Sequence, residues 1–372
     1  MKVLIAPDKF KGTLTAHEVC DAIEAGIKKF DSSIQTFKLP LADGGEGSLD
    51  ILEKSLDLDR VSVEVHDPIF RLTPSSYCLK NKTAYVEMAT ASGLQLLKQE
   101  ERNATKTTTL GTGELILDAI QKGATTIYLF VGGSATNDGG IGMAKTLGYN
   151  FIDSSGKELE PIGANLSAIS KIHISTKVDF SKISFIVATD VKNPLYGEKG
   201  AAQVYAPQKG ADPEEVESLD EGLKNFANIL ESTFGKNFSQ IPGAGAAGGI
   251  GAGAMAFLNA EIRNGIDTIM DIVGFEKHLL DSDLVITGEG KFDQQTLEGK
   301  VIQGIIQQSQ KHHKPVGVIC GISTLEDYPD TIKYLFPLVD GQTSVEEALS
   351  NAYSLVGKRA LAIMNSYQKG IK

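Results

Sequence analysis

Small residues and a carboxylate follow five apolar segments of this chain, and a sixth apolar segment runs into a glycine-rich loop. These ends lie at Asp8, Asp43–Gly47, Asp190, Glu289–Asp293, Asp340 and Gly132–Gly140. In open parallel sheets, ligands bind past the carboxyl ends of the strands. Carboxylates suit Mg²⁺, and glycine-rich turns expose backbone amides to phosphate. One such end is ordinary loop chemistry, but six of them predict a polar site that accepts a metal and handles phosphate.

The most specific local signal is Gly132–Gly140, which reads GGSATNDGG after the apolar segment 126–131. A strand, glycines, hydroxyls and a helix start, in this order, direct backbone amides at an anion. Asn137 and Asp138 could hold a substrate or a metal. The alternative is a helix cap with a tight turn, which explains one or two of these nine residues.

Basic side chains accompany two of the other strand ends. Lys9 and Lys11 follow the first apolar segment, beside Asp8. Two interpretations of this pair remain open: solvated loop lysines, or contacts to a phosphate or carboxylate. The segment Thr287–Asp293 repeats the pattern, because two acids and a lysine stand there past a buried strand.

Several known kinds of site lack their motifs here. Gly243–Gly248 matches GxGxxG, but the preceding segment 236–242 is polar and ends in proline, so we reject a dinucleotide fingerprint. A backbone nest for phosphate and a packing role both remain open for this run. The chain has no P-loop, protein-kinase motif, GxSxG elbow or histidine cluster. Protein-kinase, hydrolase-triad and zinc chemistry therefore lack support.

The predicted pattern of strands and helices that would position these residues changes twice along the chain. The first sixty residues alternate strand and helix, and Thr15 with Glu18 predicts a capping box. From Arg60 onward, short alternating strands predict antiparallel or mixed pairing. From about Asp281 the strand–helix alternation returns, with a helix expected over 296–310. We predict an α/β protein with a discontinuous Rossmann-like parallel domain and an inserted mixed α/β domain with glycine-rich loops. The expected ranges are 1–62 plus 276–372 for the first and 63–275 for the second.

Composition and net charge limit the kinds of partner that this protein is expected to bind. The chain has 372 residues, 41% of them hydrophobic, and a net charge of −11. This charge argues against nucleic acid and anionic membranes, although one local basic pocket would suffice for ATP. Three widely spaced cysteines match neither a metal motif nor a disulfide framework. The longest apolar run, 243–258, is too short to span a bilayer, and no signal peptide is visible. We expect a cytoplasmic protein with no nucleic-acid and no membrane partner.

Eight segments, taken in order, carry a further signal. They are IAPDKFKGTLTA, PLADGGEG, GTGELILDAI, GGSATNDGGIGMAKTLG, VATDVKNPLYGEKGAA, PQKGA, PGAGAAGGIGAGAMAFL and VITGEGKFDQQTLEGK. Together they resemble the bacterial glycerate kinase family, type 1, over essentially the whole chain. The resemblance implies phosphate transfer from ATP to glycerate with Mg²⁺, in two α/β domains with the active site in the cleft between them. Three positions depart from the family pattern: Lys9, where many members have Ser, Phe70, where many have Gly, and Leu110.

The resemblance and the strand ends together suggest roles. Asp190 is expected to accept the proton of the attacking hydroxyl, and Lys11 to neutralise charge on glycerate or on the transferred phosphate. The expected metal ligands are Asp43 and Asp190. The expected phosphate-binding residues of the nucleotide site are Gly132, Gly133, Ser134 and Asn137. The expected substrate-binding residues are Asp8, Asp43, Glu289 and Asp293. The acidic groups are expected to converge on one shared rim.

The function predicted from these features is ATP-dependent phosphorylation of (R)-glycerate, with 2-phosphoglycerate as the favoured product. ATP and Mg²⁺ are the expected cofactors, and the substrate is the small molecule glycerate. The alternatives are 3-phosphoglycerate as the product, or a non-catalytic sensor that binds a metabolite in the same cleft. A nicotinamide dehydrogenase is disfavoured because the dinucleotide fingerprint fails. A homo-oligomer is left open.

Overall fold

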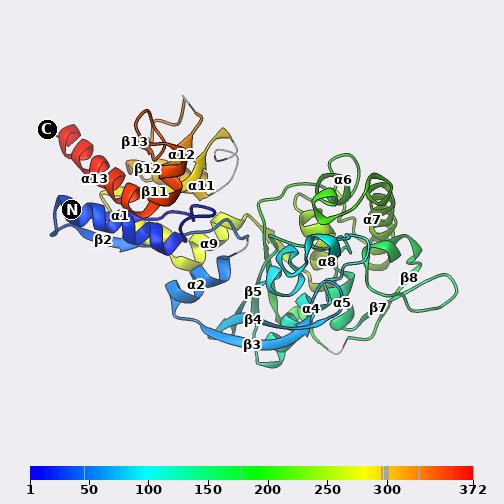
Figure 1. Ribbon diagram of the computed structural model, residues 1–372. Helices are drawn as coiled ribbons and strands as arrows, with labels where there is room; N and C mark the ends of the chain where they lie inside the picture. Colours follow the sequence, from blue (N-terminus) through cyan, green and yellow to red (C-terminus); the bar gives the residue numbers. More distant parts are fainter. Residues whose placement is uncertain (46, 177, 295, 297–300, 326, 372) are drawn as a thin grey trace. The chain divides into compact units, whose positions relative to one another are not determined.

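The chain folds into two compact units, each with its own sheet (Figure 1). The computed structural model describes residues 1–45, 47–176, 178–294, 296, 301–325 and 327–371. The first unit comprises Met1–Asp43, Asp50–Leu56 and Ile266–Lys372, and the second comprises Gly44–Leu49 and Asp57–Gly265. The domain limits expected from the sequence, 62/63 and 275/276, fall inside β3 and α10; as an assignment of folding domains they stay a prediction.

The first unit is built on a five-stranded parallel sheet in the order β13-β12-β11-β1-β2. Its strands are β1 (Lys2–Ile5), β2 (Gln35–Lys38), β11 (Leu284–Phe292), β12 (Val316–Ser323) and β13 (Ile332–Pro337). Counted along the chain, this order is 2-1-3-4-5, and the winding reverses between β1 and β11. Doubly wound sheets bind ligands past the strand ends at this reversal. The ends of β1 and β11 are therefore the expected location of a site.

Helices connect and cover these strands. They are α1 (Ala16–Phe30), α2 (Ser48–Leu56), α9 (Gly265–Val273), α10 (Phe275–Leu280), α11 (Val301–Lys311), α12 (Val345–Ser350) and α13 (Ala352–Ile371). The predicted capping box starts α1, since the backbone N–H of Thr15 donates to Glu18 at 2.8 Å. Helices α1 and α13 lie side by side (Figure 1), and a Cβ on Gly26 would stand 2.2 Å from the Gly357 carbonyl oxygen. The helix expected over 296–310 is observed from 301; residues 297–300 lie outside the described residues.

The second unit holds a six-stranded mixed sheet in the order β10-β9-β6-β5-β4-β3. Its strands are β3 (Asp59–His66), β4 (Leu72–Lys80), β5 (Thr83–Glu87), β6 (Thr126–Phe130), β9 (Ser184–Ala188) and β10 (Glu261–Arg263). β3, β4 and β5 pair antiparallel, whereas β5, β6, β9 and β10 run parallel. A separate hairpin pairs β7 (Tyr149–Ile152) with β8 (Lys171–Ile174). The predicted α/β fold with one parallel and one mixed sheet is confirmed.

The helices of the second unit surround this sheet. They are α3 (Ala89–Ser92), α4 (Leu110–Gln121), α5 (Ile141–Thr146), α6 (Ala201–Tyr205), α7 (Pro213–Phe234) and α8 (Ala246–Leu258). Short 3-10 turns occur at Leu94–Leu96, Gln99–Glu101, Gly163–Ala168, Phe180–Lys182 and Pro207–Lys209. Asp212 caps the N-terminus of α7, because its carboxylate accepts from the backbone N–H of Glu215 at 2.9 Å.

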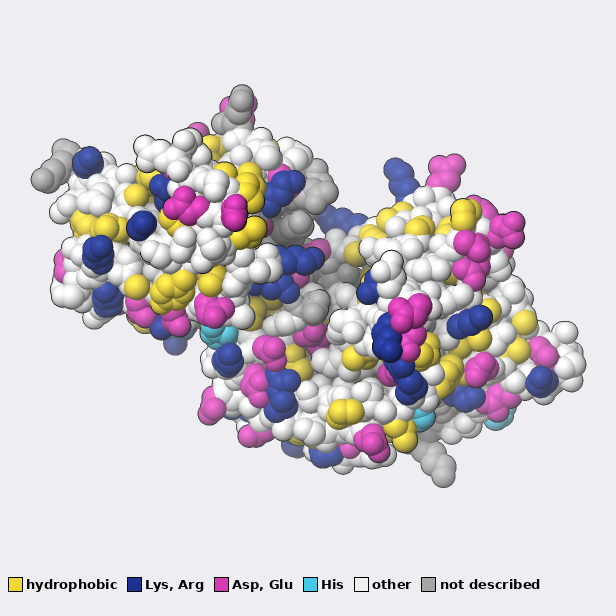
Figure 2. All heavy atoms as spheres, viewed as in Figure 1, with side chains coloured by type: hydrophobic (Ala, Val, Ile, Leu, Met, Phe, Trp, Pro, Cys, Tyr) yellow, Lys and Arg dark blue, Asp and Glu magenta, His cyan; other side chains and the backbone are white. Residues whose placement is uncertain are grey.

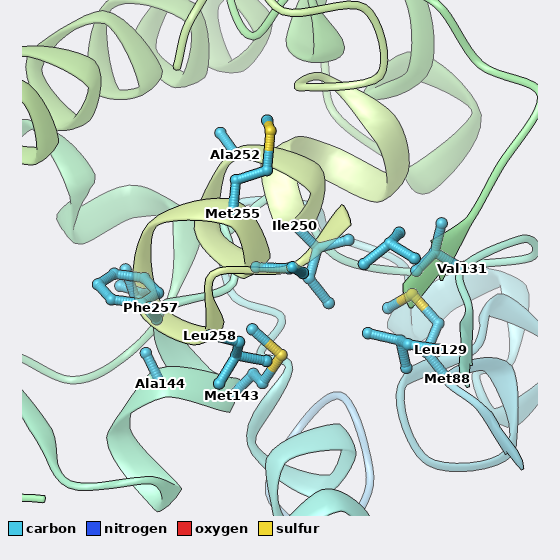
Figure 3. Packing of buried hydrophobic residues seen from close by; sticks show 14 of the residues in the cluster. Met88, Leu129, Val131, Met143, Ala144, Ile250, Ala252, Met255, Phe257 and Leu258 are labelled. Carbon is cyan, nitrogen blue, oxygen red and sulfur yellow. The ribbon is translucent and has the colours of Figure 1, made fainter. Parts of the chain in front are cut away.

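The glycine–alanine run forms a kinked start to α8. Ala247, Gly248 and Gly249 all have positive φ, at 52°, 77° and 94°. A Cβ on Gly248 would stand 2.0 Å from the Thr136 carbonyl oxygen, so the run is packed directly against the loop 132–140. Past the kink, α8 side chains enter the buried cluster beside Met143 of α5 (Figure 3). Of the two interpretations left open by the sequence, these contacts support the packing role.

Acidic and basic side chains are interspersed over the face of the molecule that is seen in Figure 2. Among the described residues, none of the helices has the length and apolar character that crossing a bilayer requires.

Candidate active site

The ends of β1 and β11 meet at the reversal of the first sheet. The backbone N–H of Asp8 donates to the carbonyl oxygen of Gly288 at 2.9 Å, so the strand pairing continues past β1 and sets Asp8 beside Glu289. Asp8 Oδ1 accepts from the backbone N–H of Lys9 at 2.6 Å. Glu289 is only 7% exposed, and its Oε1 accepts from Thr296 Oγ1 at 2.5 Å. Two of the predicted substrate-binding residues are thus brought together.

Thr296 connects Glu289 to a third acidic residue, Asp293. Its hydroxyl oxygen accepts from the backbone N–H of Asp293 at 3.1 Å while the hydroxyl donates to Glu289. The Asp293 carboxylate pairs with Lys291 Nζ at 2.8 Å, and the lysine side chain is 64% exposed. The lysine charge is thus paired at the surface, next to a second carboxylate that is almost fully buried.

Asp43 follows the neighbouring strand at the same edge of the sheet. The backbone N–H of Leu41 donates to the carbonyl oxygen of Pro7 at 3.0 Å, so the chain stays paired beyond β2 until two residues before Asp43. Asp43 is exposed, as is Lys11 in the turn between β1 and α1. Three of the predicted acids, from three adjacent strands, therefore gather at one edge of the first sheet. Asp190 belongs to the second unit.

An apolar cavity of about 90 Å³ lies beside Lys11 in the first unit. Its lining is mainly apolar and includes Phe10, Ile322, Leu338, Val339, Ala348 and Leu349. Such walls suit a planar or aliphatic group better than a carboxylate. The cavity and the acidic edge therefore offer an apolar and a polar environment near one lysine-bearing turn.

Asp340, which follows the fifth apolar segment, is hydrogen-bonded within the fold. Its Oδ1 accepts from the backbone N–H groups of Gln342 and Thr343 at 2.8 and 2.9 Å. Its Oδ2 accepts from the Arg359 guanidinium at 2.6 Å. These backbone hydrogen bonds, with the guanidinium, lower the pKa of Asp340 to about 2. The carboxylate thus closes a turn at this strand end.

In the second unit, Asp190 is held by the end of the adjacent strand. Asp190 comes two residues after β9 and is half-buried. Its Oδ1 accepts from the Asn264 side-chain amide at 2.6 Å and from the backbone N–H of Gly265 at 2.8 Å. Both donors directly follow β10, which runs parallel to β9. The carboxylate is therefore oriented by one side-chain donor and one backbone donor from the end of the neighbouring strand.

The loop after β6 holds the four predicted phosphate-binding residues. Gly132 packs against the loop at Gly45, because a Cβ on Gly132 would stand 2.5 Å from the Gly45 Cα. Gly133 is exposed, and Ser134 is 8% exposed. Ser134 Oγ accepts from Lys209 Nζ at 2.8 Å. The glycine-rich loops after β6 and at 44–45 are therefore in direct contact within the second unit.

Asn137 and Asp138 are adjacent in sequence but differ in their hydrogen bonding. Both are fully buried. Among the described residues, neither side-chain atom of Asn137 has a hydrogen-bond partner. Asp138 accepts from the backbone N–H and hydroxyl of Thr109, both at 2.8 Å, and from the backbone N–H groups of Gly140 and Gly142. Burial raises the pKa of Asp138, and these hydrogen bonds oppose that rise. Asp138 thus fixes the tight turn before α5, as the alternative interpretation expects, whereas the buried Asn137 amide is left without a partner among the described residues.

Comparison with known proteins identifies the group to which this arrangement belongs. A model of the glycerate kinase family matches residues 3–368. The chain belongs to the glycerate kinase family. The predicted membership and the prediction of a kinase enzyme of this family are both confirmed.

Individual relatives match over nearly their whole length. A glycerate kinase of Halalkalibacterium halodurans is 41% identical over 99% of both chains. A glycerate 2-kinase of Escherichia coli is 38% identical over 100% of this chain and 99% of its own. A crystal structure from Salmonella typhimurium LT2, described as glycerate kinase 2, has a TM-score of 0.89 and 39% identity, covering 100% of this chain and 99% of its own.

Three residues of this glycerate kinase family member that contact predicted site residues were not singled out from the sequence. Thr296 fixes Glu289, Asn264 fixes Asp190, and Lys209 contacts Ser134. Asn264 stands before Gly265 directly after a short strand, a turn signal that could have located it. Lys209 lies in the segment PQKGA, where a single lysine among small and apolar residues is the corresponding signal.

The carboxylates of this glycerate kinase family member can be compared with the ligands that Mg²⁺ requires. Among the described residues, no three His, Cys, Asp or Glu side chains form a metal-binding group. Mg²⁺ commonly uses one or two carboxylates, with waters and substrate phosphates completing its shell. The predicted ligands Asp43 and Asp190 are, respectively, exposed and half-buried carboxylates, which fits that chemistry.

Proposed function

We propose that this protein transfers a phosphoryl group from ATP to (R)-glycerate and forms 2-phosphoglycerate. The observation that carries the proposal is the full-length family match, residues 3–368. The choice of the 2-hydroxyl is supported by the relative named glycerate 2-kinase, which aligns over 100% of this chain. Phosphoryl transfer depends mainly on positioning and charge neutralisation, and both units supply fixed carboxylates, amides and lysines for this purpose.

Asp190 is proposed as the base. It takes the proton of the attacking hydroxyl as the oxygen approaches phosphorus. The donors from Asn264 and Gly265 hold one carboxylate oxygen and thereby orient the group. A fixed base contributes typically about 10²- to 10⁴-fold to a rate.

The acidic edge of the first unit is proposed to bind glycerate. Asp8 and Glu289 accept hydrogen bonds from substrate hydroxyls, and Asp293 shapes the same end. Lys11 neutralises the glycerate carboxylate or the transferred phosphate, which a compact ammonium does well at an exposed turn. The support is the convergence of strand ends at the reversal between β1 and β11.

The loop after β6 is proposed to bind the nucleotide phosphates. Backbone N–H groups of Gly132, Gly133 and Ser134, together with the Asn137 amide, are the donors. A buried amide without a partner among the described residues is costly unless a water or ligand meets it, which favours this role for Asn137.

Mg²⁺ is proposed to be held by Asp43 and Asp190. When bound, the ion would neutralise charge on the phosphates during transfer. The protein's contribution is to present the two carboxylates and to leave coordination positions for water and phosphate.

The direct test combines ADP release with product identification. The purified chain is given ATP, Mg²⁺ and (R)-glycerate; ADP release is followed in a coupled assay, and the product is identified by phosphorus NMR. Release of ADP that depends on glycerate, with a 2-phosphoglycerate signal, supports the proposal. A 3-phosphoglycerate signal replaces the regiochemistry alone. Glycerate binding without any ADP release would support a metabolite sensor and reject the kinase.

A further inference from the structure

Lys209 is a buried cation that the roles above leave unused. It ends the 3-10 turn Pro207–Lys209, and 2% of its surface is exposed. Its Nζ donates to Ser134 Oγ at 2.8 Å and to the carbonyl oxygen of Thr136 at 2.7 Å. Taking an ammonium out of water costs several kcal/mol unless hydrogen bonds and charge compensate. Both of these bonds go to the loop after β6.

The charge around Lys209 is only partly compensated. Burial lowers the pKa of Lys209 to about 7, and the nearby Asp138 carboxylate acts in the opposite direction. Asp138 is the ionisable group whose charge acts on Lys209, and its own oxygens accept from Thr109, Gly140 and Gly142. No ion pair joins Lys209 to an acidic side chain within the part of the chain that the structure describes. Its main polar partners are therefore the loop hydroxyl and carbonyl.

The backbone beside Lys209 is fixed as well. Gly210 has φ of +89°, and a Cβ at this position would stand 2.1 Å from the carbonyl oxygen of Arg102. The lysine therefore projects from a rigid turn. Its two acceptors, Ser134 and Thr136, lie directly before Asn137, whose buried amide has no partner among the described residues.

We propose that Lys209 is a positioning residue for phosphoryl transfer. Its ammonium joins Ser134 to the Thr136 carbonyl and thereby sets the angle at which the Gly132–Ser134 amides and the Asn137 side chain meet the nucleotide phosphates. The inference rests on the proposed kinase function and deepens it. A buried apolar side chain of the same length would fill the space without directing the loop.

The test compares four variants with the wild type. K209M keeps the length and removes the charge, K209R keeps the charge, and S134A removes one acceptor. K122M is the matched control, because Lys122 is an exposed lysine of the same unit that pairs with Asp118. Measured are kcat, the KM for ATP, the KM for glycerate and the thermal midpoint.

K209M is expected to lower kcat/KM for ATP by about 100-fold, since misplacing catalytic donors by about 1 Å has this effect. Its KM for glycerate is expected to stay within about twofold of wild type. K209R is expected to recover part of the loss, S134A to show a smaller loss, and K122M none. A K209M enzyme with kcat and KM for ATP within about twofold of wild type would overturn the proposal.

The pH profile separates positioning from a merely structural role. Because the pKa of Lys209 is lowered in the folded state, the unfolded chain binds the extra proton between about pH 7 and pH 10.5, so this group makes stability rise with pH. A positioning role that needs the ammonium predicts the reverse for activity, which falls above about pH 7. Opposite trends in the wild type, both absent from K209M, support the proposal. Activity that follows stability upward over this window contradicts it.

Failure of the kinase function can be told apart from failure of this inference. If the wild type releases no ADP with glycerate, the proposed function is wrong. Calorimetric binding of a non-hydrolysable ATP analogue to wild type and K209M then tests Lys209 alone. Binding weakened about tenfold or more in K209M, but not in K122M, supports the loop-positioning role, and equal binding rejects it.

Discussion

The side-chain amide of Asn264 lies 2.6 Å from Oδ1 of Asp190, and the two residues follow neighbouring parallel strands, β10 and β9. The backbone N–H of Gly265 adds a second bond to the same oxygen at 2.8 Å. A carboxylate held by donors from the adjacent strand cannot swing freely. The pair therefore gives Asp190 a defined orientation before any substrate binds.

Replacing Asp190 with Asn is expected to lower turnover at least about 100-fold, because an amide cannot take the hydroxyl proton. The thermal midpoint is expected to change little, since the amide oxygen can still accept both bonds. The measurement is coupled ADP release beside thermal unfolding. D220N is the control: Asp220 is also partly buried and accepts from a backbone N–H, that of Gly197, and it is not among the proposed site residues. A near-native rate for D190N would refute the base assignment.

Replacing Asn264 with Ala tests the orientation of the base separately from its chemistry. Loss of one donor is expected to reduce kcat about tenfold and to leave the KM for glycerate nearly unchanged, because the carboxylate remains but its direction is less defined. N264D is expected to be worse, since two like charges would then face each other. Equal kcat for N264A and wild type would show that the Asn264 amide does not orient the base.

Thr296 is expected to matter through Glu289 and Asp293. T296V keeps the shape but removes the hydroxyl that donates to Glu289 and accepts from the Asp293 backbone. We expect a loss of about 1 kcal/mol of stability and a higher KM for glycerate. Thr324, an exposed threonine of the same unit, gives the matched control T324V. If T296V and T324V behave alike in both measurements, Thr296 does not organise the acidic edge.

The Asp340 turn makes a prediction about acid stability. Hydrogen bonds from Gln342 and Thr343, with Arg359, lower the pKa of Asp340 to about 2, well below that of a free aspartate. The carboxylate therefore stabilises the fold above about pH 4, and this contribution is lost as the pH falls toward 2. Denaturant unfolding of wild type and D340N over pH 2 to 6 checks it. The difference between them is expected to shrink in acid; a difference independent of pH would contradict the assignment.

The kink of α8 predicts a contrast between two glycines that share a left-handed backbone. Gly248 and Gly235 have φ of +77° and +69°, but a Cβ on Gly248 would stand 2.0 Å from a carbonyl oxygen, whereas nothing lies within 4 Å of one on Gly235. G235A is expected to cost about 1 kcal/mol, the price of the conformation alone. G248A is expected to cost several times as much, because the backbone must shift. Similar losses of unfolding free energy in G248A and G235A would contradict this, because they would show that the backbone around Gly248 and Thr136 shifts at little cost.

Much of the fold was readable from local pattern. The capping box at Thr15 and Glu18 depends on four consecutive residues, and the alternation at Val61, Val63 and Val65 has the period of a half-buried strand. Parallel strands joined by helices follow from the same short-range periodicities. The gathering of Asp8, Asp43 and Glu289 at one edge then follows from topology, since parallel strands end on the same side.

By itself, the sequence determined most of the helices and long strands, the parallel and the mixed sheet, and the family, but it missed the hairpin β7–β8. Only the tertiary structure decided which strand-end side chains are hydrogen-bonded within the fold, and to which donors. Asp138 and Asp190 look alike in sequence, yet Asp138 is fully buried and accepts from four donors, whereas Asp190 is half-buried and accepts from two donors that follow β10. Lys209 lies 75 residues from Ser134, and the two meet only because the folded chain brings the turn Pro207–Lys209 to the loop after β6. Contacts across such separations depend on burial and packing, which no local pattern encodes.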